Sequence, residues 1–187
     1  MSARRFARLR RGNVPEAEGY FVLPDDGLCL NTFLVLRHPR EKGRVLLGRI
    51  DPRAAWYEFG ALEPARVQGI GRRWMLPSSQ LLFFESPLES AQRIAREQLE
   101  SPLPPVEGPL VVSEQYRRST SHADDPHWDL HFIYQGTWPN ESPPAAHPWQ
   151  ELAFVEVSQT PASEIARSQG DVLELAGLSL ANSPSKA

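Results

Sequence analysis

A strongly marked helix start lies near the middle of the chain and restricts the folds that this sequence can adopt. Ser86 is a good N-cap, Pro87 suits the first helical position, and Glu89 completes a capping box. The apolar residues that follow repeat at helical spacing: Leu88, Ala91, Ala95 and Leu99. Since Pro102 cannot continue a helix, the pattern predicts a helix over residues 87–100.

Short segments rich in Val, Leu, Ile and aromatic residues surround this helix and read as strands. The pattern predicts strands at residues 28–36, 44–50, 109–118, 127–138 and 152–157. Residues 51–73 read as irregular, and Thr160–Pro161 predicts the start of a C-terminal helix that runs to Leu175, broken or continued at Gly170. Strands on both sides of one capped helix predict an α+β fold, with a mixed sheet between helices.

Composition excludes several classes of protein. The apolar runs are far shorter than the roughly 18 residues that a membrane helix needs. A single cysteine, Cys29, excludes a disulfide framework and a cysteine-based zinc site, which predicts a cytoplasmic protein. The net charge of −3 argues against general nucleic-acid binding.

The two ends of the chain differ from its body. Five arginines and no acidic residue lie among the first eleven residues, so residues 1–13 form an Arg-rich arm. This arm either binds nucleic acid or a membrane surface, or is solvated and packs on the body or on a partner chain. We expect a single domain over residues 14–180 and a flexible tail at residues 181–187.

The residues from Trp74 to Ser101 resemble the Nudix box, G-x5-E-x7-R-E-U-x-E-E-x-G-U, where U is aliphatic. With Ser79 in the first glycine slot, Glu85, Arg93 and Glu97 fall at the Glu, Arg and Glu positions without a gap. Four other positions depart from the pattern: Ser79 and Glu100 replace glycines, and Ile94 and Gln98 replace glutamates. The resemblance implies a Nudix-type α/β/α sandwich, with the degenerate box at residues 79–101.

Within this superfamily the chain is most similar to the GDP-mannose mannosyl hydrolases. The aliphatic residue in Arg93–Ile94 is shared with that branch, and the similarity extends over residues 14–175. The branch consists of dimeric, Mg-dependent enzymes that hydrolyse nucleotide sugars at the sugar carbon. The resemblance therefore implies a homodimer that acts on a nucleoside diphosphate sugar with Mg²⁺ or Mn²⁺.

Hard oxygen ligands are what a divalent cation beside phosphates requires. Helix positions 94, 97 and 98 share one face, but two of the three carboxylates of a full box are lost here. The resemblance implies that the metal is held by Glu97, Gln98 and the Ser79 carbonyl, with Glu85 and Glu151 as further candidates and Arg93 orienting the ligands. Alternatively, Glu89, Arg93 and Glu97 are a surface ion-pair ladder.

Histidines gather in the second half of the chain. Strand alternation places His127, Asp129 and His131 on one face, where they bind a metal, phosphates or a sugar, or are merely solvated. The resemblance places His131 at a substrate-contacting histidine and makes His147 a candidate catalytic base. Arg72 and Arg73 are candidates for contact with phosphate.

Two functions follow. In the first, the chain is a metal-dependent hydrolase of a nucleoside diphosphate sugar, with His147 activating water and His131 and Asp129 holding the sugar. In the second, it is a Nudix-fold module with an eroded metal site that binds a nucleotide or a protein partner without turnover. An RNA-associated role for the arm is a weaker third possibility.

Overall fold

A computed structural model describes residues 8–9, 28–116, 127–144, 147–166 and 169–181. Most of the predicted arm and nearly all of the predicted tail lie outside these residues.

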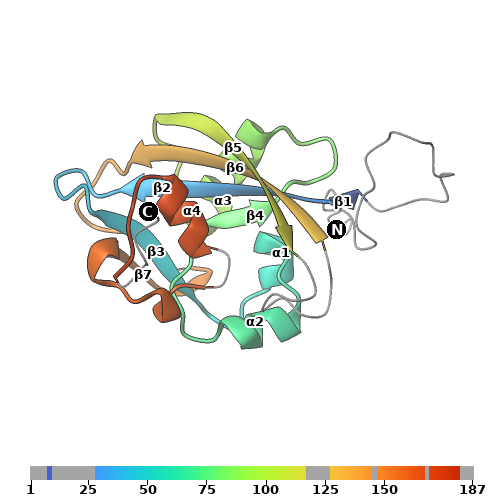
Figure 1. The fold of residues 1–187 in the computed structure, drawn as a ribbon, viewed down its shortest axis with the longest axis horizontal. Helices are drawn as coiled ribbons and strands as arrows, with labels where there is room; N and C mark the ends of the chain where they lie inside the picture. Colours follow the sequence, from blue (N-terminus) through green and yellow to red (C-terminus); the bar gives the residue numbers. More distant parts are fainter. Residues whose placement is uncertain (1–7, 10–27, 117–126, 145–146, 167–168, 182–187) are drawn as a thin grey trace, which may run out of the picture.

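Seven strands form one mixed sheet at the centre of the molecule (Figure 1). The path β5-β6-β2-β3-β7 is extended by β1 and β4, which both pair with β2. Strands β2 and β6 run parallel, and the other pairs are antiparallel. The strands are β1 Arg8–Leu9, β2 Leu28–Arg37, β3 Arg44–Ile50, β4 Ser78–Gln80, β5 Val106–Tyr116, β6 His127–Thr137 and β7 Trp149–Glu156.

Helices cover both faces of this sheet. Figure 1 shows α4 in front of β2 and α3 behind it, so the predicted α/β/α sandwich is confirmed. The helices are α1 Trp56–Gly60, α2 Pro64–Ile70, α3 Pro87–Gln98 and α4 Gln169–Leu175. Two 3₁₀ turns lie between β7 and α4 in the chain, at Val157–Gln159 and Ala162–Glu164.

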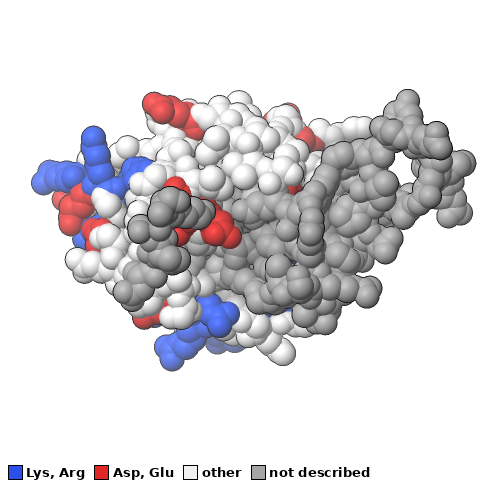
Figure 2. Space-filling model, in the orientation of Figure 1, with Lys and Arg blue, Asp and Glu red and all other residues white. Residues whose placement is uncertain are grey.

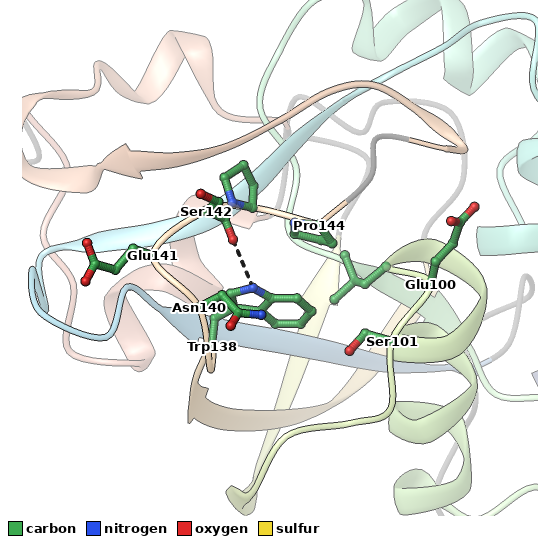
Figure 3. A pocket seen from close by; sticks show the side chains of 9 residues that line it. Glu100, Ser101, Trp138, Asn140, Glu141, Ser142 and Pro144 are labelled. Carbon is green, nitrogen blue, oxygen red and sulfur yellow. Dashed lines mark hydrogen bonds between the residues drawn. The ribbon is translucent and has the colours of Figure 1, made fainter.

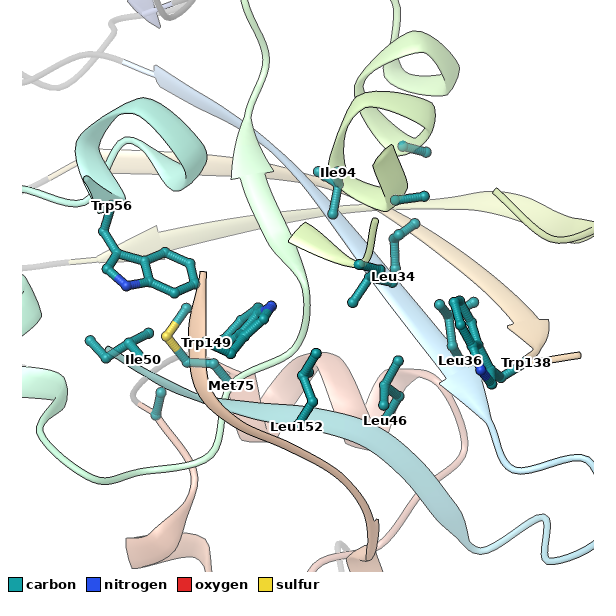
Figure 4. Close-up of a cluster of buried hydrophobic side chains, with 14 of the residues drawn as sticks. Leu34, Leu36, Leu46, Ile50, Trp56, Met75, Ile94, Trp138, Trp149 and Leu152 are labelled. Carbon is teal, nitrogen blue, oxygen red and sulfur yellow. The ribbon is translucent and has the colours of Figure 1, made fainter. Parts of the chain in front are cut away.

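Alternate residues of β2 serve two separate cores. Leu34 and Leu36 face α3 and pack in the cluster that contains Ile94 (Figure 4). Phe33 and Val35 face the other way and pack with residues of α4. Because strand side chains alternate between faces, a strand buried on both sides must be apolar almost throughout, as β2 is.

The predicted central helix is confirmed. The Ser86 hydroxyl accepts a hydrogen bond from the Glu89 N–H, and the Glu89 carboxylate accepts one from the Ser86 N–H. The helix ends at Gln98, two residues before the predicted end, and Glu100 has a φ of 49°. This left-handed residue turns the chain away from the helix axis.

The predicted strands are confirmed with small shifts of their ends, and β4 is a further short strand that the sequence pattern did not predict. After Gln80 the chain turns, because the Leu82 N–H donates to the Glu85 carboxylate and the Glu85 N–H donates to the Leu82 carbonyl. Helices α1 and α2 occupy the segment that was expected to be irregular.

The helix predicted to start at Thr160–Pro161 is wrong. Only a 3₁₀ turn follows Pro161, and the next α-helix is α4. Two bridges hold the ends of this segment extended, between Pro161 and Ala181 and between Trp74 and Ile165. These tertiary contacts outweigh the local helix signal of a Thr-Pro pair.

Charges of both signs are interspersed on the face that Figure 2 shows. Near the β2–β3 turn, Arg40 pairs with Glu141 at 2.6 Å and Arg44 pairs with Glu41 at 3.2 Å. No helix in the described part of the chain is long and apolar enough to cross a membrane.

Candidate functional site

Two residues that match the box pattern, Glu85 and Arg93, form a buried ion pair. The Arg93 Nε and Nη2 atoms donate to the two carboxylate oxygens of Glu85 at 2.7 and 2.9 Å. The Arg93 and Glu85 side chains are only 5% and 10% exposed. Arg93 also donates to the Ser79 hydroxyl and the Gln80 carbonyl. This guanidinium therefore ties β4 and the following loop to α3.

The alternative of a surface ion-pair ladder does not describe these residues. Glu89 belongs to the helix cap, and Arg93 is buried against Glu85. Glu97 lies 3.9 Å from the Arg93 guanidinium with 19% of its side chain exposed. Glu97 is thus the one carboxylate at positions 94, 97 and 98, where the box pattern implies metal ligands.

Gln98 is fully buried at the end of α3. Its Nε2 atom donates to the Ser78 carbonyl at 2.8 Å and to the Phe59 carbonyl at 3.0 Å. Its Oε1 atom accepts a hydrogen bond from the Ser78 N–H at 3.2 Å. The amide is occupied by backbone groups of β4 and α1, which is a structural role and not the expected role of a metal ligand.

The remaining predicted ligands do not complete a divalent-metal site. Both oxygens of Glu85 are bonded to Arg93, and Ile94 is fully buried. Glu151 pairs with Arg49 at 3.1 Å, and Arg49 stacks on Trp74 in the core that faces α4, away from α3. Among the described residues, no group of three or more His, Cys, Asp or Glu side chains is arranged to hold a metal ion. The donor set therefore does not fit the Mg²⁺ or Mn²⁺ that the box pattern implies.

His147 lies at the end of α3, beside Glu100. Its Nδ1 atom is 4.0 Å from the Glu100 carboxylate, its side chain is 70% exposed, and its ring contacts Phe59 edge to face. The pKa of nearby Asp51 is lowered, chiefly by the side-chain and backbone hydrogen bonds from Arg53 and to a smaller degree by the charge of His147. An exposed imidazole next to a carboxylate can accept a proton from water.

A pocket of about 580 Å³ opens next to Glu100 (Figure 3). The end of α3 forms one wall, and the loop between β6 and β7 forms the other. Trp138 lies between the two walls, and its indole N–H donates to the Ser142 carbonyl at 3.2 Å. The lining residues are Leu99, Glu100, Ser101, Trp138, Asn140, Glu141, Ser142, Pro143 and Pro144.

The predicted sugar-binding residues of β6 lie elsewhere. His131 and Asp129 are 1% and 7% exposed, on the face of the sheet that packs toward α4. Asp129 accepts a hydrogen bond from the Asn31 amide at 3.1 Å, and the His131 ring packs edge to face on Phe33. Asp129 and His131 thus share one face of β6 as predicted, but this face is buried. The side chain of His127 lies outside the described residues.

The predicted phosphate contacts, Arg72 and Arg73, are exposed after α2. The Arg73 guanidinium donates to the backbone carbonyls of Ser163 and Gly69, so it joins the 3₁₀ turn Ala162–Glu164 to α2. Among the described site residues that the sequence predicts, Glu97, Gln98 and His147 lie at the end of α3, and Gln98 is buried there.

Sequence reasoning missed the residues of the β6–β7 loop that line the pocket. Asn140, Glu141 and Ser142 form a polar run between two buried tryptophans, Trp138 and Trp149. That run was the available signal, because polar residues between anchored aromatic positions are typical of a surface loop that contributes to a site.

Comparison with solved structures supports the layer assignment. The structure is similar to a MutT NUDIX hydrolase from Burkholderia pseudomallei, with a TM-score of 0.53 and 15% identity over 79% of this chain and 96% of that chain. It is also similar to the E. coli dihydroneopterin triphosphate pyrophosphohydrolase, with a TM-score of 0.48 and 12% identity over 68% and 80% of the two chains. No protein-family model and no curated protein matches the chain. At this level of identity the likeness shows the Nudix hydrolase fold, and it assigns no substrate.

Proposed function

We propose that this chain is a Nudix-fold binding module that holds the sugar end of a nucleotide sugar in the pocket beside Glu100 without metal-dependent hydrolysis. The observation that carries the proposal is the side-chain set at the three metal-facing positions of α3. Ile94 and Gln98 have no exposed surface, and only Glu97 offers a carboxylate.

The chemistry of the pocket favours a ligand rich in hydroxyl groups. The Glu100 carboxylate can accept hydrogen bonds from hydroxyls, and Ser101 and Asn140 both donate and accept, whereas the Glu141 carboxylate is paired with Arg40. Trp138, Leu99 and two prolines supply apolar surface, which suits the C–H faces of a sugar ring. The C-terminal end of α3 and the Glu100 carboxylate give this wall of the pocket negative charge, so a bare diphosphate is disfavoured there.

Hydrolysis of a nucleoside diphosphate sugar, which the box pattern implies, is the second candidate. It is favoured by His147, which is exposed and has a carboxylate beside it. In this candidate His147 accepts the proton of the attacking water. GDP-mannose is the first compound to test, as a ligand under the first proposal and as a substrate under the second.

One experiment separates the two candidates. GDP-mannose, free mannose, guanosine and other nucleotide sugars are incubated with the protein in Mg²⁺, Mn²⁺ or chelator, and products are read by chromatography. Binding of the same compounds is measured by calorimetry. We expect no product, together with binding of the sugar-containing ligands that persists in chelator.

Three variants locate the binding site. Glu100→Gln should weaken sugar binding by about tenfold or more, because it removes a charged acceptor. Glu97→Gln tests the box carboxylate, and Glu107→Gln on exposed β5 is the matched control; both should bind as the parent does. Chelator-sensitive product that Glu97→Gln abolishes would establish the hydrolase instead. Absence of both product and binding would refute both candidates.

A further inference from the structure

The Gln98 side chain joins three elements through one amide group. Gln98 is the last residue of α3. Its side-chain nitrogen donates to the Ser78 carbonyl of β4 and to the Phe59 carbonyl of α1. A carboxamide has two N–H donors, and each finds a carbonyl here. The Gln98 oxygen accepts the Ser78 N–H, so donors and acceptor are all used at a site with no solvent exposure.

Two backbone oxygens that converge on one point normally need a positive partner. Carbonyl oxygens are ligands of hard divalent cations, and they are equally well satisfied by N–H groups. At this junction the Gln98 nitrogen lies 2.8 Å from one oxygen and 3.0 Å from the other. The amide nitrogen therefore supplies the partial positive charge that these carbonyls require.

We infer that the Gln98 amide replaces a divalent cation at the junction of β4, α1 and α3, and that exchanging its nitrogen for oxygen creates a metal site there. The inference rests on the proposed non-hydrolytic function, because it explains how the box packs without a metal. In Gln98→Glu, a carboxylate oxygen faces the two carbonyls in place of the nitrogen. Three oxygens then meet without a donor, an arrangement that is unfavourable until a cation binds between them.

The test compares thermal unfolding and Mn²⁺ binding of the full chain. In chelator, Gln98→Glu should lower the Tm by about 5–10 °C, because buried acceptors lose their donors. Millimolar Mn²⁺ should restore most of this loss, since a ligand that binds only the folded state stabilises it. Titration followed by the EPR signal of free Mn²⁺ should show one site per chain, at least about tenfold tighter than in the parent.

Two further variants serve as controls. Gln92→Glu places the same charge on an exposed position of α3. Mn²⁺ should not raise the Tm of the parent or of this variant. Gln98→Met removes the amide without offering a ligand, so it should lose stability in chelator and not recover it in Mn²⁺. If Gln98→Glu does not fold in chelator, refolding it in Mn²⁺ gives the same comparison.

The outcomes separate this inference from the proposed function. The inference would be overturned if Gln98→Glu gained no Mn²⁺ site, or if it folded neither in chelator nor in Mn²⁺. Either result would leave the proposed binding function in place. Parent protein that binds Mn²⁺ as tightly as Gln98→Glu would also overturn it. Failure of the sugar-binding experiment would refute the proposed ligand alone.

Discussion

Removal of the Arg93 guanidinium tests whether the box arginine now serves the fold. Five hydrogen bonds join it to Glu85, Ser79, Gln80 and Ser90, and 95% of its side chain is buried. In Arg93→Met, the Glu85 carboxylate remains at a site that is 10% exposed and loses its bidentate partner. Breaking a buried ion pair on one side costs about 3–5 kcal/mol. A surface ladder pair would cost only about 0.3–0.5 kcal/mol.

Urea unfolding followed by tryptophan fluorescence gives the free energy of unfolding for each variant. A double-mutant cycle with Glu85→Gln isolates the pair, because the double variant removes both members at once. Glu85→Gln alone should cost about 1–3 kcal/mol, and the double variant should cost less than the sum by about 1–3 kcal/mol.

The matched control is Arg96→Met, on the exposed face of the same helix. It should change stability by less than about 0.5 kcal/mol. The reasoning would be refuted if Arg93→Met cost no more than Arg96→Met, or if the two changes at Arg93 and Glu85 were strictly additive.

Two further predictions concern the helix cap and the packing of the sheet. Ser86→Ala should cost about 1 kcal/mol in urea unfolding. The hydrogen bond from Ser86 lowers the pKa of Glu89 in the folded state, so its contribution is present above the unfolded pKa and is lost as the pH falls through the folded value. The stability difference between parent and Glu89→Gln should therefore shrink below about pH 4, and a constant difference from pH 7 to pH 3 would contradict the cap. Gly48→Ala should destabilise by about 1–3 kcal/mol, because a Cβ would overlap the Trp149 ring. Gly69→Ala in α2, where a Cβ meets no atom within 4 Å, should instead be neutral or stabilising by up to about 1 kcal/mol, and equal costs at both glycines would rule out the packing argument.

Local signals predicted the sheet and its principal helix well. The capping box at Ser86 and the apolar run of β2 depend on neighbouring residues in the sequence, and both are present as predicted. The signals that failed depend on distant contacts. Thr160–Pro161 has the sequence of a helix start, but pairing with Ala181 holds Pro161 extended. Helix α2 begins with Pro64 at its first position, which was a usable signal in a segment that was expected to be irregular.

The candidate site was harder to predict because its residues come from different elements. The spacing of Glu85 and Arg93 indicated a shared function, but sequence alone did not show that the two side chains neutralise each other in the interior. Strand alternation placed Asp129 and His131 on one face correctly. It did not show that this face is covered, because burial on both sides of a strand is decided by the third layer of the sandwich.

The glycine positions of the box show why a shared fold does not by itself imply shared metal chemistry. Ser79 lies within β4, where the extended backbone does not require glycine, but Glu100 takes a φ of 49°, which costs an L-residue about 1–2 kcal/mol. The turn after α3 therefore persists although its glycine is lost, because Leu99 and Ile94 are fully buried and fix the helix on the sheet. Packing determines the backbone, and this packing is kept although Ile94 and Gln98 stand where the box pattern expects carboxylates. A chain can thus lose two of the three expected carboxylates on this helix face and still keep the Nudix fold.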